Sequence, residues 1–126
     1  MERSIQLFAT IHLLLMGLSH VLHSEAWTEF FLLLKRQGRA GAFVHGFITL
    51  AFGSLIVVFH PVWHGIPLLL TLLGWAYMLK ATIVFLLPRL GERSLAFVRA
   101  ERPRMFVVPG MLLTSVGLAL GYDLLR

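Results

Sequence analysis

The stretch that decides the fold is AGAFVHGFITLAFGSLIVVF, residues Ala40 to Phe59. It holds no Asp, Glu, Lys or Arg, and a helix of about 20 mostly apolar residues can cross a hydrocarbon core of roughly 30 Å. Three more apolar runs cover about Ile5 to His23, Ile66 to Leu87 and Met105 to Leu125. None shows the alternation of a membrane barrel strand. The sequence therefore predicts an all-α fold, an integral membrane four-helix bundle with residues 1–126 in one transmembrane domain.

The composition supports a membrane protein. Of 126 residues, 58% are hydrophobic and 13% are charged, and the mean hydropathy is +0.83. Soluble domains are about half apolar and about a quarter charged, so an ordinary soluble enzyme, a disordered tail and a DNA-binding module are excluded. The chain has no cysteine, which excludes disulfides, iron–sulfur clusters and thiol catalysis. No catalytic motif appears, so we expect no catalytic residues, no metal ligands and no enzymatic activity.

The net charge of +5 is concentrated in two connectors. Their basic residues are Lys35, Arg36 and Arg39 in one and Arg89, Arg93, Arg99, Arg102 and Arg104 in the other. Basic residues favour the cytoplasmic side of a membrane protein. The charge pattern therefore predicts cytoplasmic connectors and two periplasmic termini in a bacterial inner membrane, and no nucleic-acid partner.

The connectors differ in pattern. In the first, Trp27, Phe30, Phe31 and Leu34 recur at helical spacing, which indicates a short amphipathic cytoplasmic helix along the interface or an extension of the spans. Residues 90–101 show a weaker form of the same pattern. Between the second and third spans lies the short segment HPVWHGIP, residues 60–67. We expect its histidines to lie in a wet, exposed turn with Trp63 as a membrane anchor.

The two halves of the chain align at an offset of 64 residues. Gly46 then matches Gly110, Gly53 matches Gly117, and Lys35 matches Arg99. The halves 1–62 and 65–126 would form a tandem parallel repeat of two helical hairpins, related by a pseudo-two-fold axis along the membrane normal. Chance recurrence of small residues is the alternative explanation of the alignment.

Small residues form stripes on the second and fourth spans. Such stripes allow close approach of helix backbones, so we expect the second and fourth spans to form the close-packed inner pair. A helix of a partner protein is the alternative occupant. The stripe residues are Ala42, Gly46, Thr49 and Gly53 on the second span and Gly110, Thr114, Gly117 and Gly121 on the fourth.

Four histidines are candidate cofactor ligands. His20 and His45 lie at matching depth near the cytoplasmic ends of their spans, and His12 and His23 are alternative ligands. Two histidines from neighbouring helices can hold a haem or a chlorin. His20 and His23 with nearby glutamates could instead hold a transition metal. Interfacial histidines that bond water, headgroups or backbone are the third interpretation, under which there is no cofactor.

Three further residues are predicted to contact lipid headgroups. Lys80 lies within the third span about two turns before Pro88, so its long side chain can reach the cytoplasmic interface. Trp27 and Trp63 are candidate interfacial anchors. The only acidic residue inside a span is Asp123, near the opposite surface, which argues against ion-coupled transport.

Short motifs distributed along the chain carry a resemblance. They are Gly17-Leu18-Ser19-His20-Val21-Leu22, Ala26-Trp27 with Phe31, Gly46-Phe47, Phe52-Gly53, Phe59-His60 with Trp63, Gly74-Trp75 and Leu79-Lys80. In these motifs the chain resembles a group of small uncharacterised bacterial four-span inner-membrane proteins with no assigned activity. The resemblance implies a bacterial inner-membrane location and nothing about catalysis.

The functional prediction is a non-enzymatic accessory or assembly subunit of a larger membrane complex. Its partners would be the lipid bilayer and either another membrane protein or further copies of the chain. The first alternative is a haem- or chlorin-binding protein for electron transfer or pigment binding that uses the intramembrane histidines. The second alternative is an oligomeric carrier of a small solute.

Overall fold

A computed structural model describes all residues, 1–126, and every regular element in it is a helix. The helices are α1 (Glu2–Leu22), α2 (Ser24–Arg36), α3 (Arg39–Phe59), α4 (Leu68–Leu86), α5 (Pro88–Leu95) and α6 (Val107–Leu125). Helices α1, α3, α4 and α6 are long and apolar enough to cross a membrane. The predictions of an all-α fold and of four candidate spans are confirmed.

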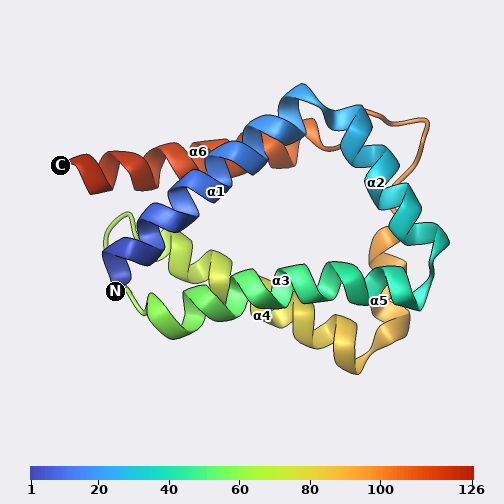
Figure 1. Cartoon of the computed structure of the whole chain (residues 1–126), viewed down its shortest axis with the longest axis horizontal. Coiled ribbons are helices and arrows are strands. Elements are labelled where there is room, and N and C mark those ends of the chain that lie inside the picture. The colour runs from blue at the N-terminus through green and yellow to red at the C-terminus, as the bar shows by residue number, and fades with distance from the viewer.

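The four long helices form two antiparallel pairs, α1 with α6 and α3 with α4 (Figure 1). Both termini and the 60–67 turn lie at one end of the molecule, called here the terminal end. At the opposite end, called the basic end, the two pairs stand apart and α2 runs from one to the other. The molecule is therefore wedge-shaped, with the pairs converging toward the terminal end.

Glycines allow the helices within each pair to approach closely. A Cβ on Gly17 of α1 would lie 2.6 Å from the backbone nitrogen of Thr114 on α6. A Cβ on Gly53 of α3 would lie 3.0 Å from the backbone nitrogen of Met78 on α4. Contacts this short leave no room for a side chain, so backbone lies against backbone in both pairs.

The expected pairing of the second and fourth spans is wrong. The small stripe of α3 packs on α4, and the small stripe of α6 packs on α1. The cause is connectivity, because the short 60–67 turn holds α3 beside α4. The stripe residues lie as follows: Gly46 and Gly53 against α4, Gly110, Thr114, Gly117 and Gly121 against α1, Ala42 near Gly91 of α5, and Thr49 in the wall of the central cavity.

The two pairs repeat the same contacts at an offset of 64 residues. A Cβ on Gly46 would meet Val84, and a Cβ on Gly110 would meet His20, the position 64 residues before Val84. The next contact along each pair repeats in the same way, Gly53 against Met78 in one pair and Gly117 against Leu14 in the other. The two helix pairs therefore share one packing register.

All four long helices share a hydrophobic core at the terminal end. Its buried residues are Ile5, Ala9 and Leu13 of α1, Phe52 and Ile56 of α3, Leu70 of α4 and Leu120 of α6. A second, smaller core lies at the basic end and consists of Leu34, Ala42, Val84 and Leu95. Because this second core lacks α1 and α6, the two pairs are joined by direct packing of all four helices only at the terminal end.

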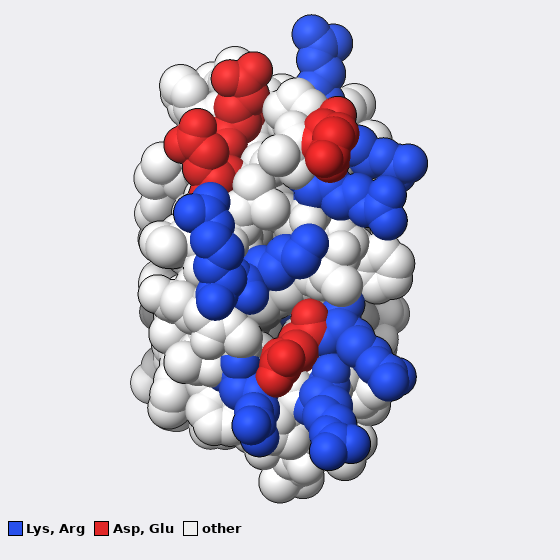
Figure 2. All heavy atoms as spheres, turned by 90° about the vertical axis from the view of Figure 1, so that its right-hand side faces the viewer, with Lys and Arg blue, Asp and Glu red and all other residues white.

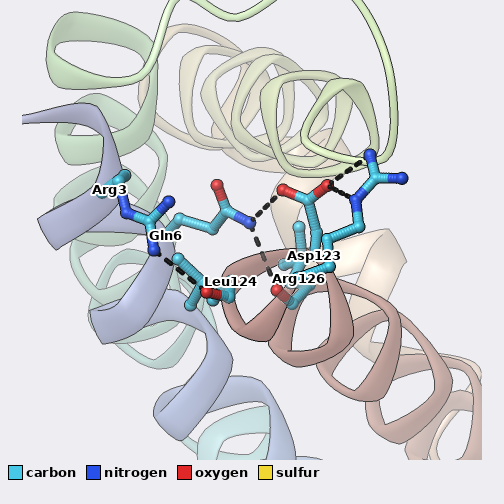
Figure 3. A network of polar contacts seen from close by, with 6 residues as sticks. Arg3, Gln6, Asp123, Leu124 and Arg126 are labelled. Carbon is cyan, nitrogen blue, oxygen red and sulfur yellow. Dashed lines mark hydrogen bonds and ion pairs between the residues drawn. The ribbon is translucent and has the colours of Figure 1, made fainter.

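A polar network ties α1 to α6 at the terminal end (Figure 3). The Gln6 amide donates to Asp123 Oδ2 at 3.0 Å and to the Leu120 carbonyl at 3.2 Å. Arg126 pairs with the same Asp123 carboxylate at 3.0 Å. Arg3 donates to the Leu124 carbonyl at 3.0 Å. Helix α1 begins at Glu2, earlier than the predicted start at Ile5.

The expectation of an exposed turn is wrong for His60, which is fully buried. The Thr71 hydroxyl donates to the carbonyls of Val62 and His60, at 2.7 and 3.0 Å, so its single hydrogen is committed. His60 Nδ1 lies 3.2 Å from that hydroxyl and must be the donor between them. His60 Nε2 is then an unprotonated, buried nitrogen without a hydrogen-bond partner. Burial lowers the pKa of His60, and its own backbone hydrogen bond and the Glu2 charge partly oppose this shift.

The basic end carries most of the charge of the molecule. Figure 2 shows this end, with numerous Lys and Arg side chains and fewer acidic ones. The helical conformation is interrupted at His23, after α1 ends at Leu22, and α2 begins at Ser24 as a separate helix. Lys35 of α2 donates to the Val98 carbonyl at 3.1 Å, and Thr28 of α2 contacts the Pro103 carbonyl. Helix α2 therefore closes this end of the wedge.

Candidate functional site

The divergence of the two helix pairs leaves a central cavity of about 890 Å³. All four long helices and α2 contribute to its walls, and most of the lining is apolar. Ligand sites in proteins typically occupy about 300–1,000 Å³ and are mainly apolar with a few polar groups. This cavity is therefore the candidate functional site.

The wall formed by α3 and α4 is the polar wall. Its polar lining residues are His45 and Thr49 of α3 and Tyr77 and Lys80 of α4. The Thr49 hydroxyl is satisfied within its helix, because it donates to the His45 carbonyl at 2.7 Å. The ring of Tyr77 packs edge-on against Phe52, with 5.4 Å between centroids.

The facing wall of α1 and α6 is apolar at the corresponding positions. The residues 64 positions from His45, Thr49, Tyr77 and Lys80 are Pro109, Leu113, Leu13 and Met16, and all eight line the cavity. The two pairs thus contribute equivalent positions to the cavity, but the chemistry of these positions differs between the walls.

His20 occupies the basic end of the cavity in a fixed orientation. Its ring stacks on Trp27 with 4.1 Å between centroids. Its Nδ1 lies 2.6 Å from the Met16 carbonyl, and since a carbonyl only accepts, Nδ1 carries the proton. The Trp27 indole donates to Ser19 Oγ at 2.9 Å, which anchors the stacked pair. His20 Nε2 therefore keeps its lone pair for another partner.

The structure does not bring His20 and His45 together as an axial pair. His45 meets the edge of Phe31 at 5.3 Å, Phe31 stacks on Phe106 at 5.0 Å, and Phe106 meets His20 at 5.8 Å. Two aromatic rings thus stand in the chain of contacts between the histidines.

The other two candidate histidines have different surroundings. His12 lines the cavity deeper in the molecule and stacks on Phe52 with 4.5 Å between centroids. His23 is exposed at the α1–α2 break, beside a polar pocket that also contains Glu25 and Glu29. No group of three His, Cys, Asp or Glu side chains is arranged to hold a metal ion.

The three residues predicted to contact headgroups lie at two places, the central cavity and the turn at the terminal end. Lys80 lines the cavity, and so does Trp27, whose indole is half-buried against His20. Trp63 is 59% exposed in the turn at the terminal end. Trp27 and Lys80 thus belong to the same cavity as the histidines.

Sequence reasoning did not identify the apolar part of this site. Met16, Phe31, Phe106 and Leu113 line the cavity, yet a Met, Phe or Leu in a membrane helix carries no functional signal by itself. The offset of 64 residues contained usable information, because it pairs Met16 with Lys80 and Leu113 with Thr49.

No family model, curated protein or solved structure matches this chain. Inference about its function therefore rests on the geometry of the cavity and on the chemistry of its walls.

Proposed function

We propose that the protein binds a large, mostly apolar small molecule of the membrane in the central cavity. The observation that supports this most directly is the cavity of about 890 Å³ among four candidate membrane-spanning helices, with a mostly apolar lining and a few polar groups, of which the only charged one, Lys80, is on the α3–α4 wall. An apolar void of this size inside a protein loses packing contacts along its whole lining. A bound molecule would restore those contacts.

In this proposal the cavity opens to the lipid phase between α3 and α6. Ile48 of α3 and Leu112 of α6 both line it, and their exposed fractions are 56% and 63%. Both side chains belong to candidate membrane spans, so the proposal places them in hydrocarbon. A lipid-soluble molecule would enter sideways between α3 and α6 without crossing water.

In this proposal the protein is a non-enzymatic binding protein of a bacterial inner membrane. Its basic end faces the cytoplasm and both termini face the periplasm, as the positive-inside pattern predicts. A role as accessory or assembly subunit of a larger complex is compatible with this activity, since the apolar outer faces of the spans fit lipid or a partner helix. A solute carrier would need an oligomer, and nothing in the geometry favours it over binding.

We further propose that the two halves are a tandem parallel repeat. The equivalent glycine contacts, Gly46 with Val84 and Gly110 with His20, support it. A two-fold operation that exchanges α1 with α4 and α3 with α6 also exchanges the two observed helix pairs. The cavity would then lie on the pseudo-two-fold axis along the membrane normal.

Quenching of Trp27 fluorescence tests whether lipid-soluble molecules enter the cavity. The Trp63→Phe, Trp75→Phe protein, in which Trp27 is the only tryptophan, is reconstituted in vesicles of brominated phosphatidylcholine. We expect the additional substitutions Leu113→Phe and Val116→Phe, which fill the cavity, to reduce the quenching. The matched control carries Met111→Phe and Leu118→Phe, which lie on the exposed side of the same helix. Equal quenching in filled and control proteins would contradict the proposal.

A haem or a chlorin is a second candidate ligand, because of the state of His20. An axial histidine commonly donates its Nδ1 proton to a backbone carbonyl and ligates through Nε2. His20 shows this arrangement with the Met16 carbonyl and lies in the cavity wall. An absorption spectrum of protein purified in mild detergent, before and after dithionite, tests this candidate. A Soret or chlorin band that disappears in His20→Ala would support it, and a colourless protein would contradict it.

A further inference from the structure

Lys80 lies in the cavity wall without a partner of opposite charge. The ion pairs of the chain join Arg39 to Glu92 and Arg126 to Asp123, and neither involves Lys80. Helix α4 ends at Leu86, and Lys80 lies about 9 Å before that end along the helix axis, for a rise of 1.5 Å per residue. A charged ammonium at this depth is costly unless an anion pairs with it. No carboxylate of the chain pairs with Lys80, whose side chain is exposed at the cavity wall, so an acidic molecule bound in the cavity can provide the anion.

Polar groups capable of donating hydrogen bonds surround this position. His45 lies at the same depth on the antiparallel partner helix, because it follows the start of α3 at Arg39 by the same number of residues. Tyr77 precedes Lys80 by about one helical turn on the same face. His45, Tyr77 and Lys80 all line the cavity, and no carboxylate lines it. This corner is therefore suited to an anion.

The facing wall has no Lys, Arg, Asp or Glu, and its polar groups are the three histidines and Ser19 of the α1 segment. Met16 and Leu13 stand at the positions equivalent to Lys80 and Tyr77, and Pro109 stands at the position equivalent to His45. A ligand complementary to both walls has one acidic end and a long apolar body. This asymmetry excludes a symmetric hydrocarbon and a molecule with charges at both ends as good fits.

From this arrangement we propose that the ligand is an anionic acyl lipid whose single acidic head group pairs with Lys80. The head group, a carboxylate or a phosphate, accepts hydrogen bonds from Tyr77 and His45. The acyl chain extends toward the terminal end, past Phe52 and Val116, which line the cavity there. The proposal rests on the proposed function, since it names the class of molecule that the cavity binds.

Binding of cis-parinarate, a fluorescent fatty-acid carboxylate, tests the head-group assignment. Energy transfer from the protein tryptophans reports its binding in detergent, and its methyl ester is the neutral probe. The variants are Lys80→Met, the conservative Lys80→Arg, and Arg89→Met as a control that removes an exposed charge from α5 outside the cavity lining. The Leu113→Phe, Val116→Phe protein gives the background from probe dissolved in detergent.

We expect wild-type protein and Arg89→Met to bind the acid at least about tenfold more tightly than the ester, the scale of a hydrogen-bonded charge pair. Lys80→Met should lose the preference for the acid, and its binding of the ester would show that this variant is folded. Lys80→Arg should retain most of the preference.

Competition by oleate and by 1-oleoyl lysophosphatidate distinguishes the two sources of the anion. The stronger competitor identifies the head group as carboxylate or phosphate.

Two outcomes would overturn the assignment, and they are distinguishable. If acid and ester bind equally to the wild type and to Lys80→Met, Lys80 extends to the aqueous interface and the cavity binds neutral molecules, so the proposed function stands alone. If neither probe binds above the cavity-filled background, both this assignment and the proposed function fail.

Discussion

Gly53 determines how closely α3 and α4 can approach. Its Cβ would lie 3.0 Å from the backbone nitrogen of Met78, which cannot move without displacing α4. Gly53→Leu should therefore lower the free energy of unfolding by about 2 kcal/mol or more through overpacking. Ala51→Leu, at an exposed position on the same helix, should leave it nearly unchanged. Unfolding midpoints in an SDS titration measure both, and equal midpoints would show that the pair does not depend on this close contact.

His60 should make the stability of the protein depend on pH. Burial holds its pKa in the folded state below the value of about 6.5 that it has in the unfolded chain. The unfolded chain therefore binds the proton more readily, and the free energy of unfolding should fall as the pH drops below about 6.5. SDS titrations at a series of pH values measure this fall. The His60→Gln protein, whose side chain keeps a donor for Thr71 but does not titrate, should show a smaller fall in the free energy of unfolding. If the free energy of unfolding depends on pH in the same way in both proteins, His60 is not the cause of the pH dependence.

The sequence indicated which single residues are candidates for the site, but it did not indicate which side chains they contact. The sequence identified His20, His45 and Lys80 because polar groups are rare in a membrane span. It could not show that Phe31 and Phe106 separate the two histidines, because that depends on where α2 lies. Burial of His60 was missed because its partner, Thr71, lies beyond two prolines in the next helix.

At the scale of elements, the network around Gln6 should fix the register of α1 against α6. Gln6→Leu removes the hydrogen bonds to Asp123 and to the Leu120 carbonyl. Hydrogen bonds between membrane helices contribute about 1 kcal/mol, so the free energy of unfolding should fall by about that amount. Leu7→Ala, an exposed neighbour on α1, should change it less. The SDS midpoint is again the measurement, and no difference between the two variants would count against a role for the network.

The helices themselves follow directly from the sequence, because length and hydropathy define a spanning segment. The six observed elements include α2 over the residues where the aromatic spacing predicts a helix. The pairing of the helices could not be predicted from the sequence. The stripes of small residues on α3 and α6 indicate that another helix lies close, but they do not identify that helix. Helices α1 and α4 carry fewer small residues, and the stripes meet both their large side chains, as Leu14 against Gly117 shows, and their single glycines, Gly17 and Gly74.

For the whole molecule, the charge pattern predicts one orientation in the membrane. The chain has no cysteine, so a single introduced cysteine is a clean label. On intact cells, a membrane-impermeant maleimide should label His64→Cys in the turn at the terminal end and leave Arg99→Cys at the basic end unlabelled until the cells are opened. Labelling of Arg99→Cys from outside would reverse the orientation and place the basic end in the periplasm.

The cavity is a property of the whole molecule, and no local pattern predicts it. It exists because the four helices share a core only at the terminal end while α2 holds the pairs apart at the basic end. Its lining comes from five helices distributed from His12 to Val116. The sequence supplied the polar candidates, and the arrangement of the two pairs places most of them around one volume.

Native mass spectrometry tests the central claim, that the two helix pairs enclose a site occupied by a membrane molecule. The wild-type protein, the cavity-filled Leu113→Phe, Val116→Phe variant and the outward-facing Met111→Phe, Leu118→Phe control are released from the same mild detergent. We predict a discrete additional mass on the wild type and on the control that is absent from the filled variant. The same adducts on all three proteins, or none on any of them, would contradict the claim.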